Sequence, residues 1–183
     1  IALAGKLDNL DDPRYDFKAD TDLALGALGE FAGVKQSVDG TMHAALTATG
    51  PMSQLKVTAR LDGQNLTVER FDRLNLKAET GYDLAAQRVI LDSFNILSPA
   101  GTIQGKANVA LTDKAGTSNL NASVRGLDLA KISNTLKLPV RIASRATANI
   151  AARWPAMKFD QAAGGVTVRL TASQSTPAPN VVP

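Results

Sequence analysis

Hydrophobic and polar residues alternate along most of this chain, and the alternation returns in one segment after another. Clear examples are residues 38–48, 55–61, 74–79 and 103–111. A period of two is typical of β-strands with one dry and one wet face, because successive side chains point to opposite faces of a sheet. The pattern therefore predicts an all-β protein whose sheet carries one continuous apolar surface.

Turn residues separate the predicted strands, and the connections between them are short. We expect strands at 1–7, 14–21, 37–48, 53–61, 65–70, 73–82, 88–97, 101–112, 118–125, 140–152 and 158–172. The expected breaks are Asp12-Pro13, Gly50-Pro51, Asp62-Gly63, Pro99–Gly101, Asp113–Gly116 and Gly164-Gly165. Because parallel pairs need long crossovers, such short connections predict a long antiparallel β-meander.

Two stretches depart from the period of two and predict short helices. Residues 25–31 and 129–136 place apolar residues at helical spacing. Asp22 and Asp128 are the expected N-caps of these helices, since aspartate side chains accept hydrogen bonds from the first free N–H groups of a helix.

The same two stretches indicate an internal repeat. Apolar positions in a unit of about 15–51 match those in a unit of about 118–155 at a constant offset of 104, without gaps. The shared unit is a strand, a short helix, a long strand and a turn that ends in proline. Such a repeat predicts a fold that grows by adding units along one axis.

Length and composition fit one β-sheet domain over residues 1–172, followed by a Ser/Thr/Pro-rich tail or linker over residues 173–183. The chain begins at Ile1 within a predicted strand and without an initiator methionine, so we interpret it as a segment of a longer protein. The net charge of +3 is spread along the strands with no basic cluster interleaved with aromatics, which argues against nucleic-acid binding.

The sequence offers little catalytic or metal-binding chemistry. There is no cysteine, and the only histidine, His43, lies on the polar phase of its strand with no marked nucleophile. The acidic run Asp8–Asp12 lacks the spacing of an EF-hand loop. Trp154 directly precedes a proline, and we expect it to cap the edge of an apolar layer. We therefore predict neither an enzyme nor a cofactor or metal site.

Two segments carry a resemblance to a known family. Residues 98–109, SPAGTIQGKANV, and residues 120–132, LNASVRGLDLAKI, are similar to the repeats of the AsmA-like superfamily, nearest to the TamB translocation and assembly module proteins. The resemblance covers residues 15–172. It consists of small and apolar residues, and no catalytic motif contributes to it. In the first repeat Ala24 stands at the position of Asp128, so that copy matches less well.

The resemblance implies a fold and a setting. Family members are anchored in the bacterial inner membrane and extend through the periplasm as a twisted sheet curled into a gutter, the β-taco. They are thought to carry phospholipid acyl chains toward the outer membrane, or to assist the assembly of outer-membrane proteins with an outer-membrane barrel protein as partner. Adjacent repeats of the same longer chain would continue the sheet.

On this interpretation the apolar phase of the strands forms a lipid-binding groove. Its predicted wall is Met42, Ala44, Leu46, Leu55, Val57, Leu61, Leu74, Leu76, Ile103, Val109, Leu120, Val124, Ile142, Ile150, Val166, Val168 and Leu170. The alternative is a closed β-sandwich or barrel that serves as a structural or adhesive module without a ligand. Aromatic residues make up only 4% of the chain, which mildly favours the gutter, because closed cores commonly use more large side chains.

Overall fold

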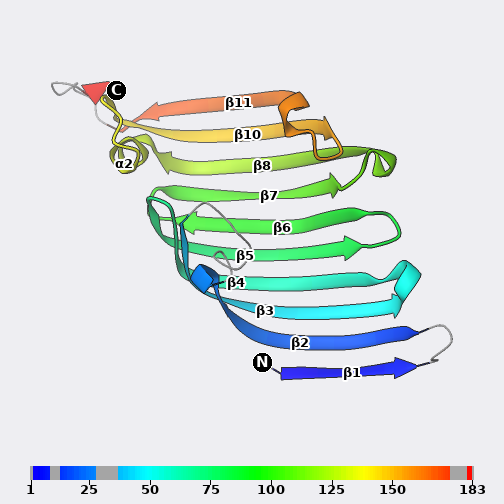
Figure 1. The fold of residues 1–183 in the computed structure, drawn as a ribbon. Coiled ribbons are helices and arrows are strands. Elements are labelled where there is room, and N and C mark those ends of the chain that lie inside the picture. Colours follow the sequence, from blue (N-terminus) through cyan, green and yellow to red (C-terminus); the bar gives the residue numbers. More distant parts are fainter. Residues whose placement is uncertain (1, 9–12, 28–36, 174–180, 183) are drawn as a thin grey trace.

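A computed structural model describes residues 2–8, 13–27, 37–173 and 181–182. Ten strands form one antiparallel sheet in which each strand lies beside its neighbours in the chain (Figure 1). In sheet order they are β1 (Ala2–Asp8), β2 (Arg14–Ala24), β3 (Val38–Pro51), β4 (Lys56–Val68), β5 (Phe71–Asp83), β6 (Arg88–Ser98), β7 (Gly101–Ala110), β8 (Thr117–Asp128), β10 (Ser144–Pro155) and β11 (Ala163–Ala172).

The sheet is open. Strands β1 and β11 form its two edges, and they do not pair with each other. The all-β meander predicted from the alternation is therefore confirmed, and the described strands do not close into a barrel.

The remaining elements are short. Three 3-10 turns, η1 (Met52–Gln54), η2 (Asp113–Ala115) and η3 (Phe159–Gln161), lie in connections between strands, and α2 (Leu129–Thr135) interrupts the path from β8 to β10. Strands β9 (Arg141–Ile142) and β12 (Val181–Val182) form a separate parallel pair.

Helix α2 begins where the sequence predicts. The side chain of Asp128 accepts a hydrogen bond from Lys131 N at 3.1 Å, which makes Asp128 the N-cap. The other predicted N-cap was wrong: Asp22 lies within β2, and the described helical residues 25–27 follow directly after that strand. The rest of the predicted helix, residues 28–31, lies outside the described residues.

The predicted turn at Asp62-Gly63 is also wrong, because β4 continues through it as one strand. The pairing of β4 with β5 shifts register between Gly63 and Leu66, which is the signature of a β-bulge. Leu66 is 4% exposed, and a Cβ on Gly63 would lie 2.6 Å from its Cδ1 atom. The glycine thus makes room for a buried leucine, and the chain turns only after Val68.

The two predicted repeat units share their strand pairing only beside the helical segment, because a register shift in β10 then pairs Ala148 with Val124 where the offset from Thr21 and Ala44 would pair it with Arg125. Ala24 of β2 pairs with Thr41 of β3, and Asp128 of β8 pairs with Arg145 of β10. Each residue of the second pair follows its counterpart by 104 positions, the offset seen in the sequence. A helical segment lies between the two strands in both units.

Candidate functional site

The apolar residues of the strands gather on one face of the sheet. Successive pairs join Met42 to Gly63, Gly63 to Leu76, Leu76 to Ile96, Ile96 to Ile103, Ile103 to Val124, Val124 to Ala148 and Ala148 to Val168. Because paired residues in a sheet point to the same face, this row crosses eight strands on one side. We call this side the apolar face.

The predicted groove wall falls on the apolar face with one exception. Parallel rows run through Ala44, Leu61, Ile150 and Val166, through Leu46 and Leu120, and through Val57 and Val109. Leu55 lies directly before β4, and Leu74 and Leu170 keep the phase of their strands. Ile142 does not join them, because it lies in the short strand β9 outside the ten-stranded sheet.

Burial on the apolar face changes from the middle of the sheet to its edges. In the interior Ala44, Ala78 and Val124 are less than one tenth exposed. At the edge strand β11, Val166 and Val168 are 63% and 53% exposed. The opposite edge strand β1 exposes its leucines as well. The apolar surface therefore reaches both edges of the sheet without a polar border.

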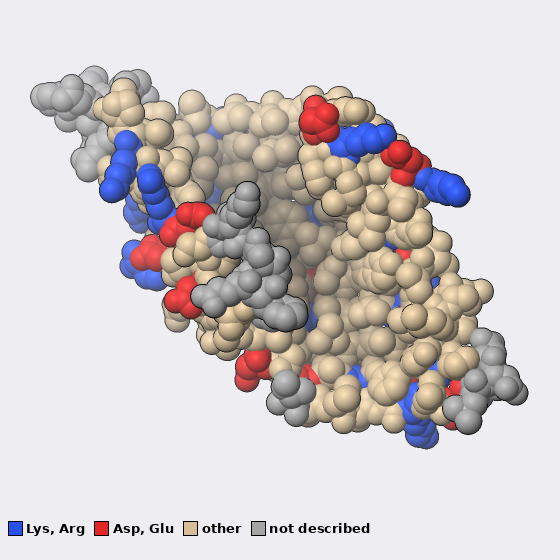
Figure 2. Space-filling view, in the orientation of Figure 1, with Lys and Arg blue, Asp and Glu red and all other residues tan. Residues whose placement is uncertain are grey.

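Figure 2 views the apolar face, which is hollowed along its middle and carries most of its charged side chains near its margins. No described element packs across the middle of this face: α2 contacts β9 and β10 at one end of the sheet. A surface of this extent is unusual on a protein that functions alone, since contiguous apolar patches above a few hundred Å² commonly mark binding sites.

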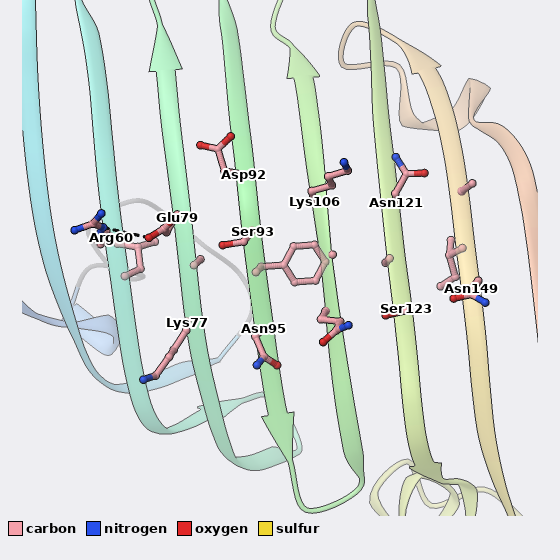
Figure 3. A pocket seen from close by; sticks show the side chains of 18 of the residues that line it. Arg60, Lys77, Glu79, Asp92, Ser93, Asn95, Lys106, Asn121, Ser123 and Asn149 are labelled. Carbon is pink, nitrogen blue, oxygen red and sulfur yellow. Dashed lines mark hydrogen bonds and ion pairs between the residues drawn. The ribbon is translucent and has the colours of Figure 1, made fainter.

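The opposite face of the sheet is polar, and it holds a trough that the sequence analysis did not predict. The trough has a volume of about 1220 Å³ and crosses the middle of the strands from β3 to β11. Figure 3 shows ten of its polar side chains, among them Arg60, Lys77, Asn121 and Asn149, on one side of the sheet.

One row of polar side chains runs the length of this trough. In pairing order it is Asp22, His43, Asp62, Lys77, Asn95, Gln104, Ser123, Asn149 and Thr167. Its first half, on β2 to β5, is ionic, and its second half, on β6 to β11, holds only amides and hydroxyls. The trough can therefore hold polar groups by hydrogen bonds along a whole row, while the rows of the apolar face are mostly aliphatic, with Thr80 and Tyr82 of β5 among the hydroxyls on that side.

Ion pairs bridge the strands at the ionic half of the trough. Lys77 Nζ lies 3.4 Å from Asp62 Oδ2, and Arg60 Nε donates a hydrogen bond to Glu79 Oε1 at 3.2 Å. The second oxygen of Asp62, Oδ1, is buried and has no hydrogen-bond partner. These exposed and half-exposed pairs contribute little stability individually.

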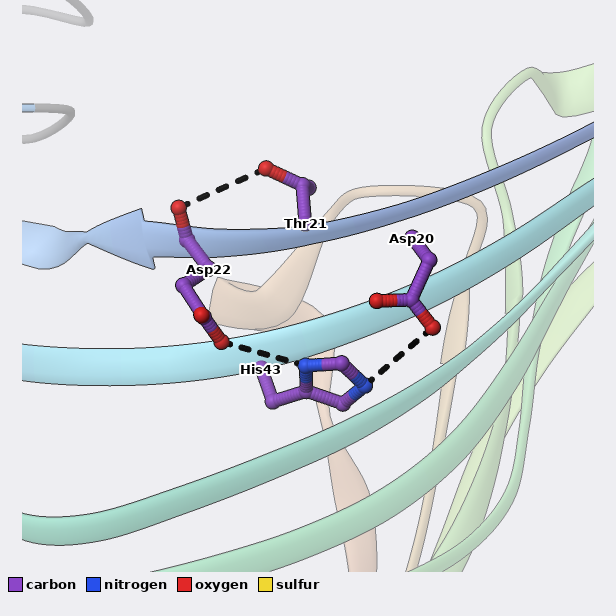
Figure 4. A network of polar contacts seen from close by, with 4 residues as sticks. All are labelled: Asp20, Thr21, Asp22 and His43. Atoms are coloured by element: carbon purple, nitrogen blue, oxygen red, sulfur yellow. Dashed lines mark hydrogen bonds and ion pairs between the residues drawn. The ribbon is translucent and has the colours of Figure 1, made fainter. Parts of the chain in front are cut away.

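His43 is solvent-exposed on its strand, as its polar phase predicts, but two aspartates of β2 flank it (Figure 4). Its Nδ1 atom donates a hydrogen bond to Asp22 Oδ1 at 3.1 Å, and its Nε2 atom lies 3.5 Å from Asp20 Oδ2. The hydrogen bond to Asp22 and then the charge of Asp20 raise the pKa of His43 above 6.5. The partners of the His43 ring among the described residues are the two aspartates, and neither of them is a hydroxyl or thiol nucleophile.

Searches of protein-family models, of curated proteins and of solved structures found no match to this chain. The geometry of the two faces is therefore the basis for any functional argument.

Two other candidate sites have simple structural roles. Trp154 is 7% exposed and packs against Phe159, with ring centroids 5.3 Å apart, so it fills the end of the apolar layer as predicted. Asp8 is the only residue of the acidic run Asp8–Asp12 that the structure describes. Within the described parts of the chain there is no group of three His, Asp or Glu residues arranged to hold a metal ion.

None of the helices among the described residues is long and apolar enough to cross a membrane. The aliphatic rows of the apolar face offer non-directional contact with apolar groups. Such contact gives about 0.8 kcal/mol for each CH₂ group removed from water.

Proposed function

We propose that the apolar face binds phospholipid acyl chains and that this chain is a segment of a longer, AsmA-like envelope protein. In that protein the groove would conduct phospholipids between the inner and outer membranes, or assist the assembly of outer-membrane proteins. The observation that carries the proposal is the open ten-stranded sheet whose apolar face is hollowed and crossed by no described element.

The composition of the face supports a conduit more than a tight binding pocket. Its side chains are mostly Ala, Val, Leu and Ile, and the register lines them up in rows from β3 to β11 in which Thr80 and Tyr82 of β5 are exceptions. A hydrocarbon chain that slides along such rows exchanges one set of equivalent contacts for the next. A polar group within the rows would either hold a head group or cost desolvation energy.

The apolar surface at both sheet edges supports a place within a longer sheet. The exposed leucines of β1 and the exposed aliphatic side chains of β11 would continue the surface of adjacent strands. Unpaired edge strands commonly pair with another segment, because their free N–H and C=O groups offer a template. The proposed neighbours are adjacent repeats of the parent protein, which we propose to be periplasmic and anchored in the inner membrane.

Lipid analysis tests the proposal directly. The protein is purified from bacterial cells without detergent, and its bound lipids are extracted and identified by mass spectrometry. We expect near-stoichiometric phospholipid. A monodisperse, folded protein without lipid would overturn the proposal and favour the structural or adhesive module in its place.

A matched pair of variants on β11 locates the lipid. Val168 and Thr167 are neighbours that point to opposite faces, and both are exposed, so an arginine at either position leaves no buried charge. We expect Val168→Arg to lower the amount of co-purified phospholipid and Thr167→Arg to leave it unchanged. Equal lipid in both variants would show that the lipid does not lie on the apolar face.

A further inference from the structure

A group of exposed apolar side chains lies outside the apolar face, in the segment that follows α2. Leu136, Leu138 and Val140 are 40%, 48% and 46% exposed. They occupy alternate positions of a five-residue segment, and none of them belongs to a strand of the large sheet. We call Leu136–Val140 the apolar loop.

Backbone hydrogen bonds hold the apolar loop in one shape. Lys137 N donates to Asn134 O at 3.1 Å, and Leu138 N donates to Ser133 O at 2.8 Å. With Lys137 at φ 55°, these bonds form the Schellman arrangement that ends a helix. Pro139 then fixes its own φ and restricts the backbone of Leu138 before it. The leucines are thus presented to solvent by an ordered helix end.

Basic residues are frequent in the part of the chain that holds the apolar loop. Lys131 and Lys137 lie on α2 and on the loop, and both are exposed. Arg125 and Arg145 are exposed at the ends of β8 and β10 next to α2, and Arg169 of β11 pairs with Thr147 of β10. The end of the molecule that holds α2 accordingly carries several Lys and Arg side chains in Figure 2.

Acidic residues are scarce in the same part of the chain. Residues 117–183 contain eight Lys and Arg but only two acids, Asp128 and Asp160. Asp128 caps α2, and Asp160 lies in η3 at the far end of β10. Residues 1–50 have the opposite balance, with four Lys and Arg and eight Asp and Glu. The two ends of the sequence therefore differ in the sign of their charge.

We propose that the apolar loop docks on the surface of an anionic lipid bilayer. Leu136, Leu138 and Val140 would enter the boundary between head groups and acyl chains, and the basic residues of this part of the chain would contact anionic head groups. This combination of a small apolar insertion and nearby positive charge is what reversible membrane binding requires, because neither contribution alone is sufficient. The positive charge selects a lipid surface over an uncharged apolar partner.

Docking at this corner is a separate property from acyl-chain binding on the apolar face. The loop lies beside α2 at one end of the sheet, and its side chains are not part of the rows that form the apolar face. Vesicle binding therefore tests the docking, and lipid extraction tests the groove, so either proposal can fail alone.

Co-sedimentation with vesicles tests the docking. The full chain is mixed with vesicles of phosphatidylcholine alone, or of phosphatidylcholine with about 30% phosphatidylglycerol. We expect binding to the anionic vesicles that weakens as salt is raised, because salt screens the charges. Equal binding to both vesicle types, or binding to neither, would overturn the proposal.

Variants distinguish binding through the apolar loop from nonspecific binding through other exposed apolar side chains. We expect the triple variant Leu136→Ser, Leu138→Ser and Val140→Ser to lose vesicle binding by about tenfold or more. The control variant replaces Met52 and Met157 with serine; these residues follow β3 and β10 and are 57% and 47% exposed, and the variant should bind as the wild type does. Circular dichroism checks that both variants fold.

A second variant tests how much the positive charge of the lysines contributes to vesicle binding. We expect Lys131→Gln with Lys137→Gln to weaken binding to anionic vesicles and to reduce its salt dependence. If the serine variant binds like the wild type while the glutamine variant does not, the interaction is one of charge alone and the proposed insertion is wrong.

Discussion

His43 and Asp22 face each other across β3 and β2, and the Nδ1 atom of His43 donates a hydrogen bond to Asp22 Oδ1 at 3.1 Å (Figure 4). Asp20, two residues earlier on the same strand, reaches the other ring nitrogen. One imidazole therefore links two carboxylates of β2 to β3, close to the edge of the sheet.

This contact predicts a pH dependence. The hydrogen bond to Asp22, followed by the charge of Asp20 and more weakly that of Asp62, raises the pKa of His43 above its ordinary value. A pKa that is higher in the folded than in the unfolded state gives stabilisation that is complete below the unfolded pKa of about 6.5 and is lost as pH rises through the folded pKa. We expect the attachment of β2 to β3 to be stronger in mild acid than in mild base.

NMR titration of the His43 ring measures the pKa directly. We expect a value above 6.5 that falls toward it in Asp22→Asn, and less so in Asp20→Asn. Asp92→Asn, on the distant strand β6, serves as the control and should leave the titration unchanged. A wild-type pKa at or below 6.5 would contradict the contact.

Replacing the buried Ser118 should destabilise the protein more than replacing an exposed serine. Its side chain is fully buried, accepts a hydrogen bond from Ala110 N at 2.9 Å and donates one to Ala156 O at 2.6 Å. Ser118→Ala leaves a buried N–H and a buried C=O without partners, so we expect the free energy of unfolding to fall by about 2 kcal/mol. Urea denaturation measures the change. Ser93→Ala, at an exposed position of the trough, should cost less than about 0.5 kcal/mol.

Two glycines should respond differently to the same substitution. A Cβ on Gly105 of β7 would lie 2.9 Å from Ala122 Cα and 2.8 Å from Phe94 Cζ, and the nearby Asn121 carbonyl leaves it no room. We expect Gly105→Ala to push β7 from β8 and to cost about 2 kcal/mol of unfolding free energy. A Cβ on Gly165 of β11 meets nothing within 4 Å, so Gly165→Ala should be close to neutral. Similar thermal midpoints for both variants would refute this packing.

Charge placed in the interior of the apolar face should remove lipid. Leu76 and Val109 are half-buried residues of the apolar face, so Leu76→Arg and Val109→Asp each place a charged group among its apolar side chains. If acyl chains occupy the face, we expect both variants to fold and to lose most of the co-purified phospholipid, because a charge in contact with hydrocarbon costs solvation energy. Lys77→Arg, on the polar face beside Leu76, should retain the lipid. Unchanged lipid in a folded Leu76→Arg protein would count against the groove.

Strand alternation predicted which residues share a face, because that property depends only on the local backbone. Leu76 and Ile103 are distant in sequence, yet the register places them in one row as their phases require. The role of Gly63 was missed for the opposite reason. An Asp-Gly pair is a common turn, and only the packing of Leu66 against Gly63 shows that the strand continues.

The trough on the polar face could not be predicted from alternation. The sequence identifies Asn95, Gln104 and Asn149 as polar positions, which is equally consistent with a solvated convex surface. Whether such side chains enclose a cavity depends on how the strands bend and twist together, and that is a property of the assembled sheet. The sequence likewise did not predict the partners of His43, because Asp20 and Asp22 come close to it only when β2 pairs with β3 in this register.

The order of strands in the large sheet follows the order of strands in the chain, and α2 and β9 lie between β8 and β10 without changing that order. A hairpin can therefore be inserted or deleted without rerouting any other connection. Each strand adds about 4.8 Å along the stacking direction and leaves the cross-section unchanged. Duplication or loss of hairpins would thus change the length of such a protein in small, regular steps. The distance that it spans would be proportional to the number of its strands.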